Sequence, residues 1–514
     1  MEIILLLCLA AVIYRPWDAP HLPLTDFGLF FGARGESSSL LSQYGNVASY
    51  YIAEGRLCLI TYLYLVLGGA AFGTWATGWH WSYFALNTTV LMLAISLLKK
   101  LGISRIAIVA SLALWLTMGP TAELWLRPAG EPIALIFFLV AMHQALNFHS
   151  APDWHRRALI IAGCAVGIGF TKELLVVLLP AGWLLSRLSP ANGEWRWASW
   201  TKRDMTLAMI VGASVFVAMI PVVYVAMRAS DVSYAAQYSA DFSRLPALLN
   251  RLEIALVPSV PRLHWLTRFQ NDPVWVILRT LPNLLWIIMI VSALAAARRT
   301  RVGWPVVVGM AWVGAGVLAY LPWPAQSNYY MMPFALGTMF IAAHALHAPL
   351  GTKNKNRRAA IGVIGLLILV SSVEARSTLH QQRLRAGMNG GVIDAIAKQG
   401  GADLLIAAVP NPLPGNGGWA SHLQGFGTVG HRMPVGKSAE MNCDDAKRAL
   451  ESTPNTVVVS AAGGCGEITD SPLVISGTAP RTAWPTLWRS MRSEGRMYVN
   501  RSGDHRRVSD SRSF

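Results

Sequence analysis

Carboxylates near the start of this chain are placed where they can do acid–base chemistry. Asp18 and Asp26 lie in a polar stretch, 14–36, that directly follows the apolar run 3–13. A positioned carboxylate is a suitable general base for taking the proton of a hydroxyl group. Asp26, in "PLTDFGLFF", is the candidate catalytic base, and its alternative role is to cap a turn in "LTDFG". Asp18, which precedes "AP", is a candidate for a supporting role and fits a structural one.

Two basic residues at the ends of apolar runs are candidates for binding an anion such as a phosphate group. Arg127 stands in "ELWLRPAGEP" and Lys172 in "GIGFTKELLVVLLP". The alternative for Arg127 is an ion pair with a neighbouring glutamate, and for Lys172 it is a side chain that snorkels from a helix end. The supporting candidates around these two residues are Glu123, Glu131, Glu173 and Tyr330, of which the tyrosine also suits an interfacial aromatic belt.

The sequence does not indicate a defined metal site or an organic cofactor. His21 lies near Asp18 and Asp26, but the three residues have no recognised metal-ligand spacing. No metal ligands are therefore predicted, and a divalent ion at this stretch stays an open alternative. Glycine-rich pieces in the C-terminal part, such as "SAAGGCGE", do not match a phosphate-binding loop.

The composition is that of a mainly α-helical protein that crosses a membrane many times. Hydrophobic residues make up 54% of the 514 residues, charged residues only 14%, and the mean hydropathy is +0.41. Soluble domains have about a quarter of their residues charged. The net charge of +16 would suggest a nucleic-acid partner in a soluble protein, but here the basic clusters separate hydrophobic runs. They are better explained by orientation in a membrane, so no nucleic acid is predicted as a partner.

Apolar segments recur from the start of the chain to about residue 374. The first run has no basic n-region and no small-residue cleavage site, so we expect it to be retained as a span rather than removed. The sequence predicts about eleven spans of roughly 20 residues each. Besides the first, the segments are 80–98, 104–119, 132–148, 157–171, 173–187, 205–227, 277–297, 303–321, 329–347 and 358–374.

The basic clusters give the orientation of these spans, because loops rich in Lys and Arg stay in the cytoplasm. If the segment 55–73 crossed the membrane, every later basic cluster would lie outside. If it lies along the interface as a juxtamembrane helix, all clusters lie inside, so this interpretation is preferred. The outer loop 14–79 then carries the candidate base, and the C-terminus lies outside. The clusters are Lys99-Lys100 with Arg105, Arg156-Arg157, Lys202-Arg203, Arg298-Arg299 with Arg301, and 353–358.

The chain divides into a membrane domain, 1–374, an extracytoplasmic α/β domain, 375–501, and a disordered tail, 502–514. A helix is predicted over 376–400, with the glycine ending it. Strand-like runs follow at "DLLIAAVP", "NTVVVSA", "SPLVISG" and "RMYVN", with a helical stretch "CDDAKRALES" among them. Cys443 and Cys465 can form a disulfide if this domain lies outside the cytoplasm.

The order of these features resembles that of the membrane glycosyltransferases with the GT-C fold. These include the protein O-mannosyltransferases and bacterial enzymes that take sugars from polyprenyl phosphate. The resemblance covers most of residues 1–347 and is one of layout and loose motifs. The family's acidic residue in the first outer loop is matched by Asp26 alone, without a second acidic neighbour. Its "TKE"-like turn is matched by Lys172-Glu173, and its late "RY…P" motif by "NYYMMP", with Asn328 in place of the arginine.

The resemblance implies a bacterial inner-membrane enzyme with its active site and C-terminus on the periplasmic side. The donor would be a polyprenyl-phosphate-linked sugar, and the acceptor a glycan, a lipid or a protein of the cell envelope. Asp26 would be the base, and Arg127 and Lys172 would bind the donor phosphate. Direct displacement would invert the anomeric centre. Two alternatives stay open: a polysaccharide polymerase or ligase, and a non-catalytic envelope transporter or scaffold.

Overall fold

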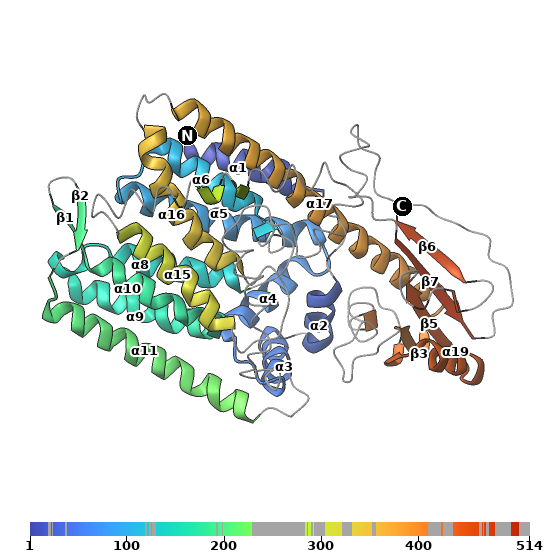
Figure 1. Ribbon diagram of the computed structural model, residues 1–514. Helices are drawn as coiled ribbons and strands as arrows, with labels where there is room; N and C mark the ends of the chain where they lie inside the picture. Colours follow the sequence, from blue (N-terminus) through green and yellow to red (C-terminus); the bar gives the residue numbers. More distant parts are fainter. Residues whose placement is uncertain are drawn as a thin grey trace.

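A bundle of long helices is joined by one continuous helix to a small sheet domain (Figure 1). The computed structural model describes residues 1–18, 22, 24–35, 39–118, 121–122, 125, 130–191, 194–197, 199–228, 283–284, 286–288, 291, 304–320, 331–351, 356–409, 423–424, 435–461, 465, 467–468, 472–477 and 495–502. The prediction of a mainly α protein with a small C-terminal α/β part is confirmed.

The bundle helices coincide with most of the predicted apolar segments. Among the described residues, two helices, α5 and α11, are both long and apolar enough to cross a bilayer by length and composition, and shorter apolar helices accompany them. The predicted span 277–297 lies mostly outside the described residues, so the number of eleven spans stays a prediction. The helices are α1 (Glu2–Tyr14), α5 (Ala76–Lys100), α6 (Arg105–Thr117), α8 (Glu131–Ala145), α9 (Trp154–Thr171), the 3-10 helix η2 (Glu173–Leu178) with α10 (Leu179–Ser186), α11 (Lys202–Met227), α15 (Trp304–Tyr320), α16 (Met332–Gly351) and α17 (Asn356–Lys398).

Small residues let neighbouring helices of the bundle approach closely, as in helix pairs within membranes. Helices α15 and α16 show this most clearly. A Cβ atom on Gly316 would lie 2.5 Å from Cγ of Phe334, and one on Gly337 would lie 2.7 Å from Cγ of Trp312. At the edge of the bundle, α11 leaves large apolar side chains exposed, with Phe216 at 68%. Such a face is suited to lipid rather than to water.

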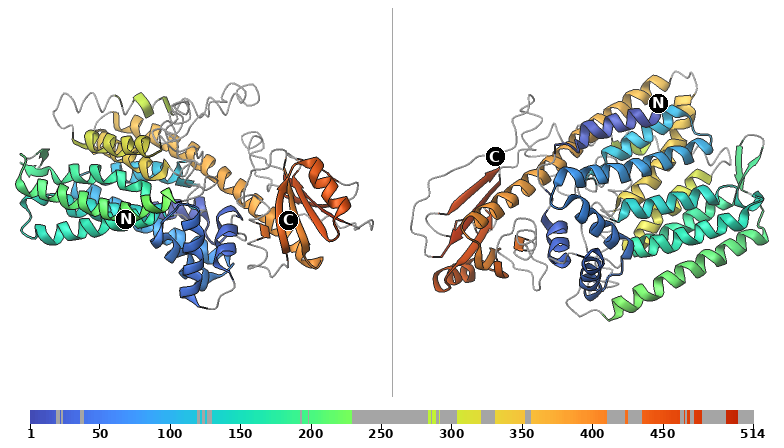
Figure 2. Two further views of the ribbon diagram at one scale, coloured as in Figure 1. Left: turned by 90° about the horizontal axis from the view of Figure 1, so that it is seen from below. Right: turned by 180° about the vertical axis from the view of Figure 1, so that it is seen from behind.

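The described basic clusters meet at one end of the bundle. Glu2, at the start of α1, forms ion pairs with Lys99 at 3.2 Å and Arg105 at 3.3 Å. The backbone N–H of Ser104 donates to Nδ1 of His347 near the end of α16, at 2.9 Å. Arg203 donates to the carbonyl of Ala151 at 3.2 Å, which brings two further basic loops together. The N-terminus and the hairpin of β1 (Leu188–Ala191) and β2 (Glu194–Trp197) lie at this end in both Figure 1 and Figure 2.

The segment between α1 and α5 starts and finishes at the opposite end of the bundle. Trp17 and Trp81 lie with ring centroids 6.4 Å apart. The intervening chain forms three short helices, α2 (Leu24–Arg34), α3 (Leu40–Ala53) and α4 (Leu59–Phe72). A 14-residue α4 is about 21 Å long, which is shorter than the roughly 30 Å hydrocarbon core of a bilayer. Helices α1 and α6, at 13 residues each, are as short, so the interpretation of 55–73 as an interfacial helix stays a prediction. Helices α2 and α3 were not predicted.

Two adjacent glycines of α4 allow close packing against two neighbours, Gly69 against α2 and Gly68 against α5. A Cβ atom on Gly69 would lie 2.9 Å from Cζ of Phe30 in α2, and one on Gly68 would lie 2.5 Å from Cη2 of Trp79. Arg34, at the end of α2, donates to the carbonyl of Gly69 at 3.2 Å. The apolar cluster formed here also includes Val392 of α17, so the outer helices and the base of the sheet domain share one core.

Helix α17 runs without a break from the bundle into the sheet domain (Figures 1 and 2). Its 43 residues correspond to about 64 Å. The predicted boundary at residue 374 therefore falls inside a helix, and the predicted span 358–374 and the helix after it are one element. The glycines end it as expected, since Gly400 has φ +84° and Gly401 has φ +83°.

The C-terminal domain is a five-stranded mixed sheet with the strand order β4-β3-β5-β7-β6. Strands β4, β3 and β5 are parallel, and β7 and β6 are antiparallel to their neighbours. Four strands match the predicted runs, while β4, with the polar sequence "VGKSAEM", was not predicted. The tail from residue 503 lies outside the described residues. The elements are β3 (Ala402–Ala408), β4 (Val435–Met441), α19 (Cys443–Ser452), β5 (Thr456–Ala461), β6 (Leu473–Gly477) and β7 (Gly495–Arg501).

A disulfide joins Cys443, at the start of α19, to Cys465, with the Cα atoms 5.4 Å apart. Cys8, Cys58 and Cys164 are not paired with another cysteine. Disulfides persist mainly in oxidising compartments. The bond is therefore consistent with a sheet domain on the extracytoplasmic side, at the end of the bundle away from the basic clusters.

Candidate functional site

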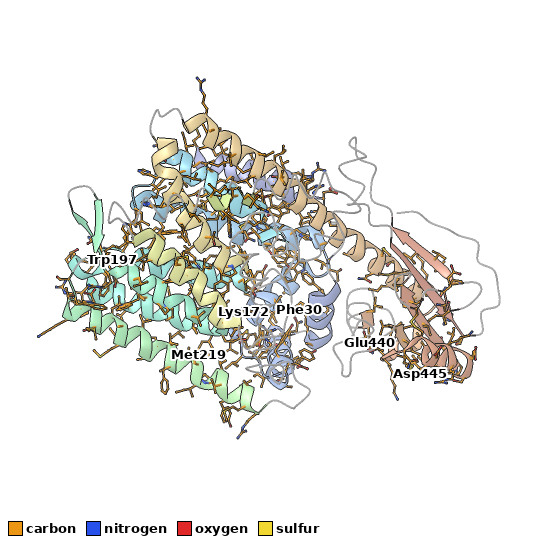
Figure 3. All side chains as sticks on the ribbon, viewed as in Figure 1. Phe30, Lys172, Trp197, Met219, Glu440 and Asp445 are labelled. Atoms are coloured by element: carbon orange, nitrogen blue, oxygen red, sulfur yellow. A yellow bond between two sulfur atoms is a disulfide. The ribbon has the colours of Figure 1, made fainter. Side chains whose placement is uncertain are left out.

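A buried ion pair lies at the end of the bundle opposite the described basic clusters, next to α4. The ammonium of Lys172 is 3.1 Å from Oε1 of Glu131, and the side chains are only 8% and 1% exposed. Figure 3 shows Lys172 at the same end of the bundle as Phe30 of α2. A charge at this depth is stable only when it is paired. The structure thus brings together two residues that the sequence suggested separately.

The backbone around Lys172 explains how this side chain comes to lie there. Helix α9 ends at Thr171, and Lys172 adopts an extended conformation with φ −154° and ψ 96° before η2 begins at Glu173. Lys172 keeps backbone hydrogen bonds to both helices. Its N–H donates to the carbonyl of Ile168 at 2.8 Å, and its carbonyl accepts from the N–H of Leu175 at 2.9 Å. An extended residue between two helices directs its side chain to a different face from its neighbours.

Glu131 is held at the first turn of α8, where the helix dipole favours a negative charge. The residue before it, Gly130, has no space for a side chain. A Cβ atom there would lie 2.5 Å from Oγ1 of Thr61 and 2.9 Å from the carbonyl oxygen of Thr171. The hydroxyl of Thr61 donates to that same carbonyl at 2.7 Å. The start of α8, the end of α9 and the start of α4 are therefore locked together at this point.

A second acidic residue near Lys172, Glu173, contacts the segment that leads into α4. The thiol of Cys58 donates to Oε2 of Glu173 at 2.9 Å, although the two residues are 115 positions apart. The side chain of Arg56 approaches the same sulfur, with Nη2 at 3.9 Å. Burial, and next the carboxylate of Glu173, raises the pKa of Cys58 to about 12, while Arg56 and Lys172 act in the opposite direction. The thiol therefore stays protonated at neutral pH and serves as a hydrogen-bond donor.

Arg56 is the residue of this cluster that the sequence analysis did not single out. Its guanidinium lies 5.9 Å from the ring centroid of Tyr51, and its carbonyl accepts from the hydroxyl of Tyr62 at 3.1 Å. The rings of these two tyrosines stack at 4.9 Å. The sequence could have indicated it through its position in the predicted outer loop. A basic residue in such a loop is not needed to orient the protein in the membrane, so it is a candidate for another role.

The cluster combines two positive and two negative side chains in a small, partly buried region. The residues are Arg56, Glu131, Lys172 and Glu173. An arginine and a lysine held close together can bind a phosphate group through charge-assisted hydrogen bonds. Two carboxylates beside them hold the basic side chains in place while no anion is bound. The arrangement is therefore suited to binding an anionic group that enters from the membrane surface.

The remaining sequence candidates are placed only in part. Asp26 is the third residue of α2, and its side chain lies outside what the structure describes, so its approach to Lys172 stays a prediction. Arg127, Glu123 and Tyr330 also lie outside the described residues. Asp18 does not join the Lys172 cluster through any contact given by the described residues, and it forms ion pairs with Arg15 at 3.9 Å and with Arg383 at 3.8 Å.

Among the described residues, no group of three or more His, Cys, Asp or Glu side chains is arranged to hold a metal ion. His21 and the side chain of Asp26 are not among those residues. The open alternative of a divalent ion at Asp18, His21 and Asp26 is therefore not tested by the described part of the chain.

Comparison with known proteins identifies the fold. No protein-family model matches the sequence, and no curated protein matches it. Among solved structures, the crystal structure of ArnT from Cupriavidus metallidurans bound to undecaprenyl phosphate superposes with a TM-score of 0.51, at 13% identity, over 97% of this chain and 98% of that one. The apo form of the same protein gives a TM-score of 0.47 at the same identity and coverage. The likeness to the first of these shows that the chain has the GT-C fold, as the sequence predicted.

Proposed function

We propose that this protein is an integral membrane glycosyltransferase that moves a sugar from a polyprenyl-phosphate donor to an acceptor at the outer face of a bacterial inner membrane. The observation that carries the proposal is the cluster of Arg56, Glu131, Lys172 and Glu173 in a GT-C fold, at the end of the bundle opposite the basic clusters. The structurally similar ArnT was crystallised with undecaprenyl phosphate, which is the kind of lipid phosphate that a polyprenyl-phosphate sugar leaves after transfer, and this supports the choice of donor class.

The basic residues of the cluster have a direct role in such a reaction. When the bond between the anomeric carbon and the phosphate oxygen breaks, negative charge grows on the lipid phosphate that leaves. Preorganised cationic donors in a site with little water stabilise this charge by about 3 kcal/mol each. Lys172 and Arg56 are the described residues that can supply it, and Arg127 joins them in the proposal.

The second half of the reaction needs a base for the acceptor. The acceptor hydroxyl oxygen forms the new bond to the anomeric carbon, and its proton passes to a carboxylate. Asp26 is proposed for this role, because it stands on α2 one turn before Phe30, which packs against α4. One displacement of this kind inverts the anomeric centre. The lipid phosphate is the leaving group, so the reaction requires no nucleotide on the outer face.

The location of the sheet domain bears on the side of the membrane at which transfer takes place. The domain carries the Cys443–Cys465 disulfide and lies at the end of the bundle where α2, α3 and α4 lie (Figure 1). A disulfide favours the periplasmic side. The acceptor class stays open among glycans, lipids and proteins, and the sheet domain is available to hold it.

The test is sugar transfer by the purified full-length chain in detergent, given synthetic polyprenyl-phosphate sugars and an envelope extract from cells that lack the gene. Mass spectrometry should show a product heavier by one sugar. Asp26→Asn should reduce the rate by a factor of about 100 or more. Asp153→Asn is the matched control, because Asp153 is a half-exposed carboxylate that pairs with Arg157 at the inner end, and it should leave the rate unchanged.

A second variant, Arg56→Gln, tests the cluster itself and should slow transfer by a factor of about 100 or more, with Arg105→Gln at the inner end as its control. A product with many added repeat units would favour a polymerase or ligase. Absence of any transfer, together with unchanged glycan masses in cells that carry Asp26→Asn, would favour a transporter or scaffold and would refute the proposal.

A further inference from the structure

A second group of charged residues lies where α1 ends against α17, on helices other than those that form the Lys172 cluster. Arg15 is the residue after α1 and has a left-handed backbone with φ 40°. Arg376 and Arg383 stand two turns apart on α17. Arg376 donates to the carbonyl of Ile13 at 3.0 Å, and Arg383 donates to the carbonyl of Arg15 at 3.0 Å. The two α17 arginines therefore cap the carboxyl end of α1.

Capping does not account for all of the positive charge. Among the described side chains, the carboxylate that faces these arginines is Asp18, which is 3.9 Å from Arg15 and 3.8 Å from Arg383. The carboxyl end of a helix contributes about half a negative charge. The positive charge at this point therefore exceeds the negative charge by about 1.5 elementary charges. The Arg383 side chain is only 13% exposed, whereas those of Arg15 and Asp18 are 48% and 55% exposed, so water screens the charge of Arg383 least.

Two further features of the described residues favour an anion at this point. Burial, and then the charge of Arg376, lowers the pKa of Arg383 to about 10; Arg15 adds to this lowering, and Asp18 opposes it. The Nε–H of Arg383 is buried and has no hydrogen-bond acceptor among the described residues. Guanidinium groups that repel each other in a partly dry environment are stabilised by an anion that several of them can share.

The surroundings indicate which anion this is. Trp17 and Trp81 are 55% and 45% exposed and lie beside each other just beyond the end of α1. Exposed tryptophans of this kind are typical of the membrane–water interface. On the membrane side, Val12 of α1 is 66% exposed and Leu369 of α17 is 62% exposed, which leaves apolar faces for acyl chains. A phosphate group attached to such chains satisfies both the arginines and the apolar faces.

We propose that Arg15, Arg376 and Arg383 form a binding site for the phosphate group of an anionic lipid of the outer leaflet, seated between α1 and α17. The bound lipid would stabilise the contact between α1 and α17, the helix that carries the sheet domain. The proposal does not depend on the glycosyltransferase activity, because none of these residues belongs to the Lys172 cluster.

The test uses the purified, delipidated full-length chain in neutral detergent. Apparent dissociation constants are taken from the rise of the unfolding temperature with ligand concentration. The probes are short-chain phosphatidylglycerol, short-chain phosphatidylcholine and inorganic phosphate. Phosphatidylglycerol should bind the wild type more tightly than phosphatidylcholine does. The double variant Arg376→Gln/Arg383→Gln should bind it at least about tenfold more weakly, and the control Arg156→Gln/Arg157→Gln, at the inner end, should bind it as the wild type does.

A gain-of-affinity variant keeps the test decisive if the double variant does not fold. Asp18→Asn removes the carboxylate that competes for the arginines and should tighten phosphatidylglycerol binding several-fold. Inorganic phosphate that binds as tightly as the lipid, and that the same double variant loses, would support the phosphate site and identify a soluble anion as its occupant. Equal lipid binding by the wild type and the double variant, or no tightening in Asp18→Asn, would overturn the proposal.

Discussion

The Lys172–Glu131 pair gives the sharpest test of how the candidate site is held together. The two side chains are 8% and 1% exposed and 3.1 Å apart, so neither charge is screened by solvent in the absence of the other. Removing one partner of a buried pair costs about 3–5 kcal/mol, because the remaining charge loses a counter-charge in a dry environment. We therefore expect Lys172→Met and Glu131→Gln each to reduce the folding equilibrium constant by about two to four powers of ten.

The double variant Glu131→Gln/Lys172→Met separates stability from activity. It removes both charges at once and replaces them with side chains of similar size, so most of the lost stability should return. Transfer activity should stay low, because the proposed phosphate ligand is still missing. The single variant Glu131→Gln should keep a positive charge at the site and, where it folds, should retain more activity than either variant that lacks Lys172.

Both quantities can be measured on the same preparations. Unfolding in mixed micelles, followed by tryptophan fluorescence, gives the free energy of unfolding for the wild type, the two single variants and the double variant. Transfer from a polyprenyl-phosphate sugar gives the activity. A double variant as unstable as either single variant would show that the two charges do not act as a pair. A double variant with wild-type activity would show that Lys172 does not bind the donor.

Two further predictions concern the framework of the protein. Gly130→Ala should destabilise the junction of α4, α8 and α9 by about 1–3 kcal/mol and should lower activity, because the added Cβ atom meets the backbone carbonyl of Thr171 at 2.9 Å. The control is Gly163→Ala, at a site with nothing within 4 Å. Equal effects of the two changes would contradict the close approach. Cys443→Ser should destabilise the sheet domain by about 2–4 kcal/mol, which should appear as faster proteolysis of that domain. Unchanged proteolysis under oxidising conditions would show that the bond to Cys465 does not stabilise the domain.

Many helices and strands of the fold were open to prediction because they depend on local patterns. Apolar segments of membrane length gave the positions of α5, α6, α8, α9 and α11, and short runs of branched apolar residues gave β3 and β5. Strand β4 was missed because "VGKSAEM" is polar, and among the described strands it lies at the edge of the sheet beside β3. The continuity of α17 was missed because its hydropathy changes sharply near residue 374 while its backbone does not.

For the candidate site, the sequence predicted which residues could take part but not how they contact one another. Lys172, Glu131 and Glu173 stand out in the sequence as charges at the ends of apolar runs. That Lys172 pairs with Glu131, and that Glu173 accepts from Cys58, depends on how α4, α8 and α9 pack. Arg56 was missed for the same reason, since only this packing brings the loop before α4 to the end of α9. Asp18 was a supporting candidate that also fitted a structural role, and only the tertiary structure places it against the arginines at α17.

By itself, the sequence determined that the chain is a helical membrane protein, that its described basic clusters share one end of the bundle, and that its C-terminal part is a small α/β domain. These properties follow from hydropathy and charge along the chain, which act on each segment separately. The tertiary structure alone decided which charges neutralise one another, because partners such as Cys58 and Glu173, 115 residues apart, meet only when the helices have packed. A buried charge is stable only beside its partner, so the chemistry of the site follows from that packing.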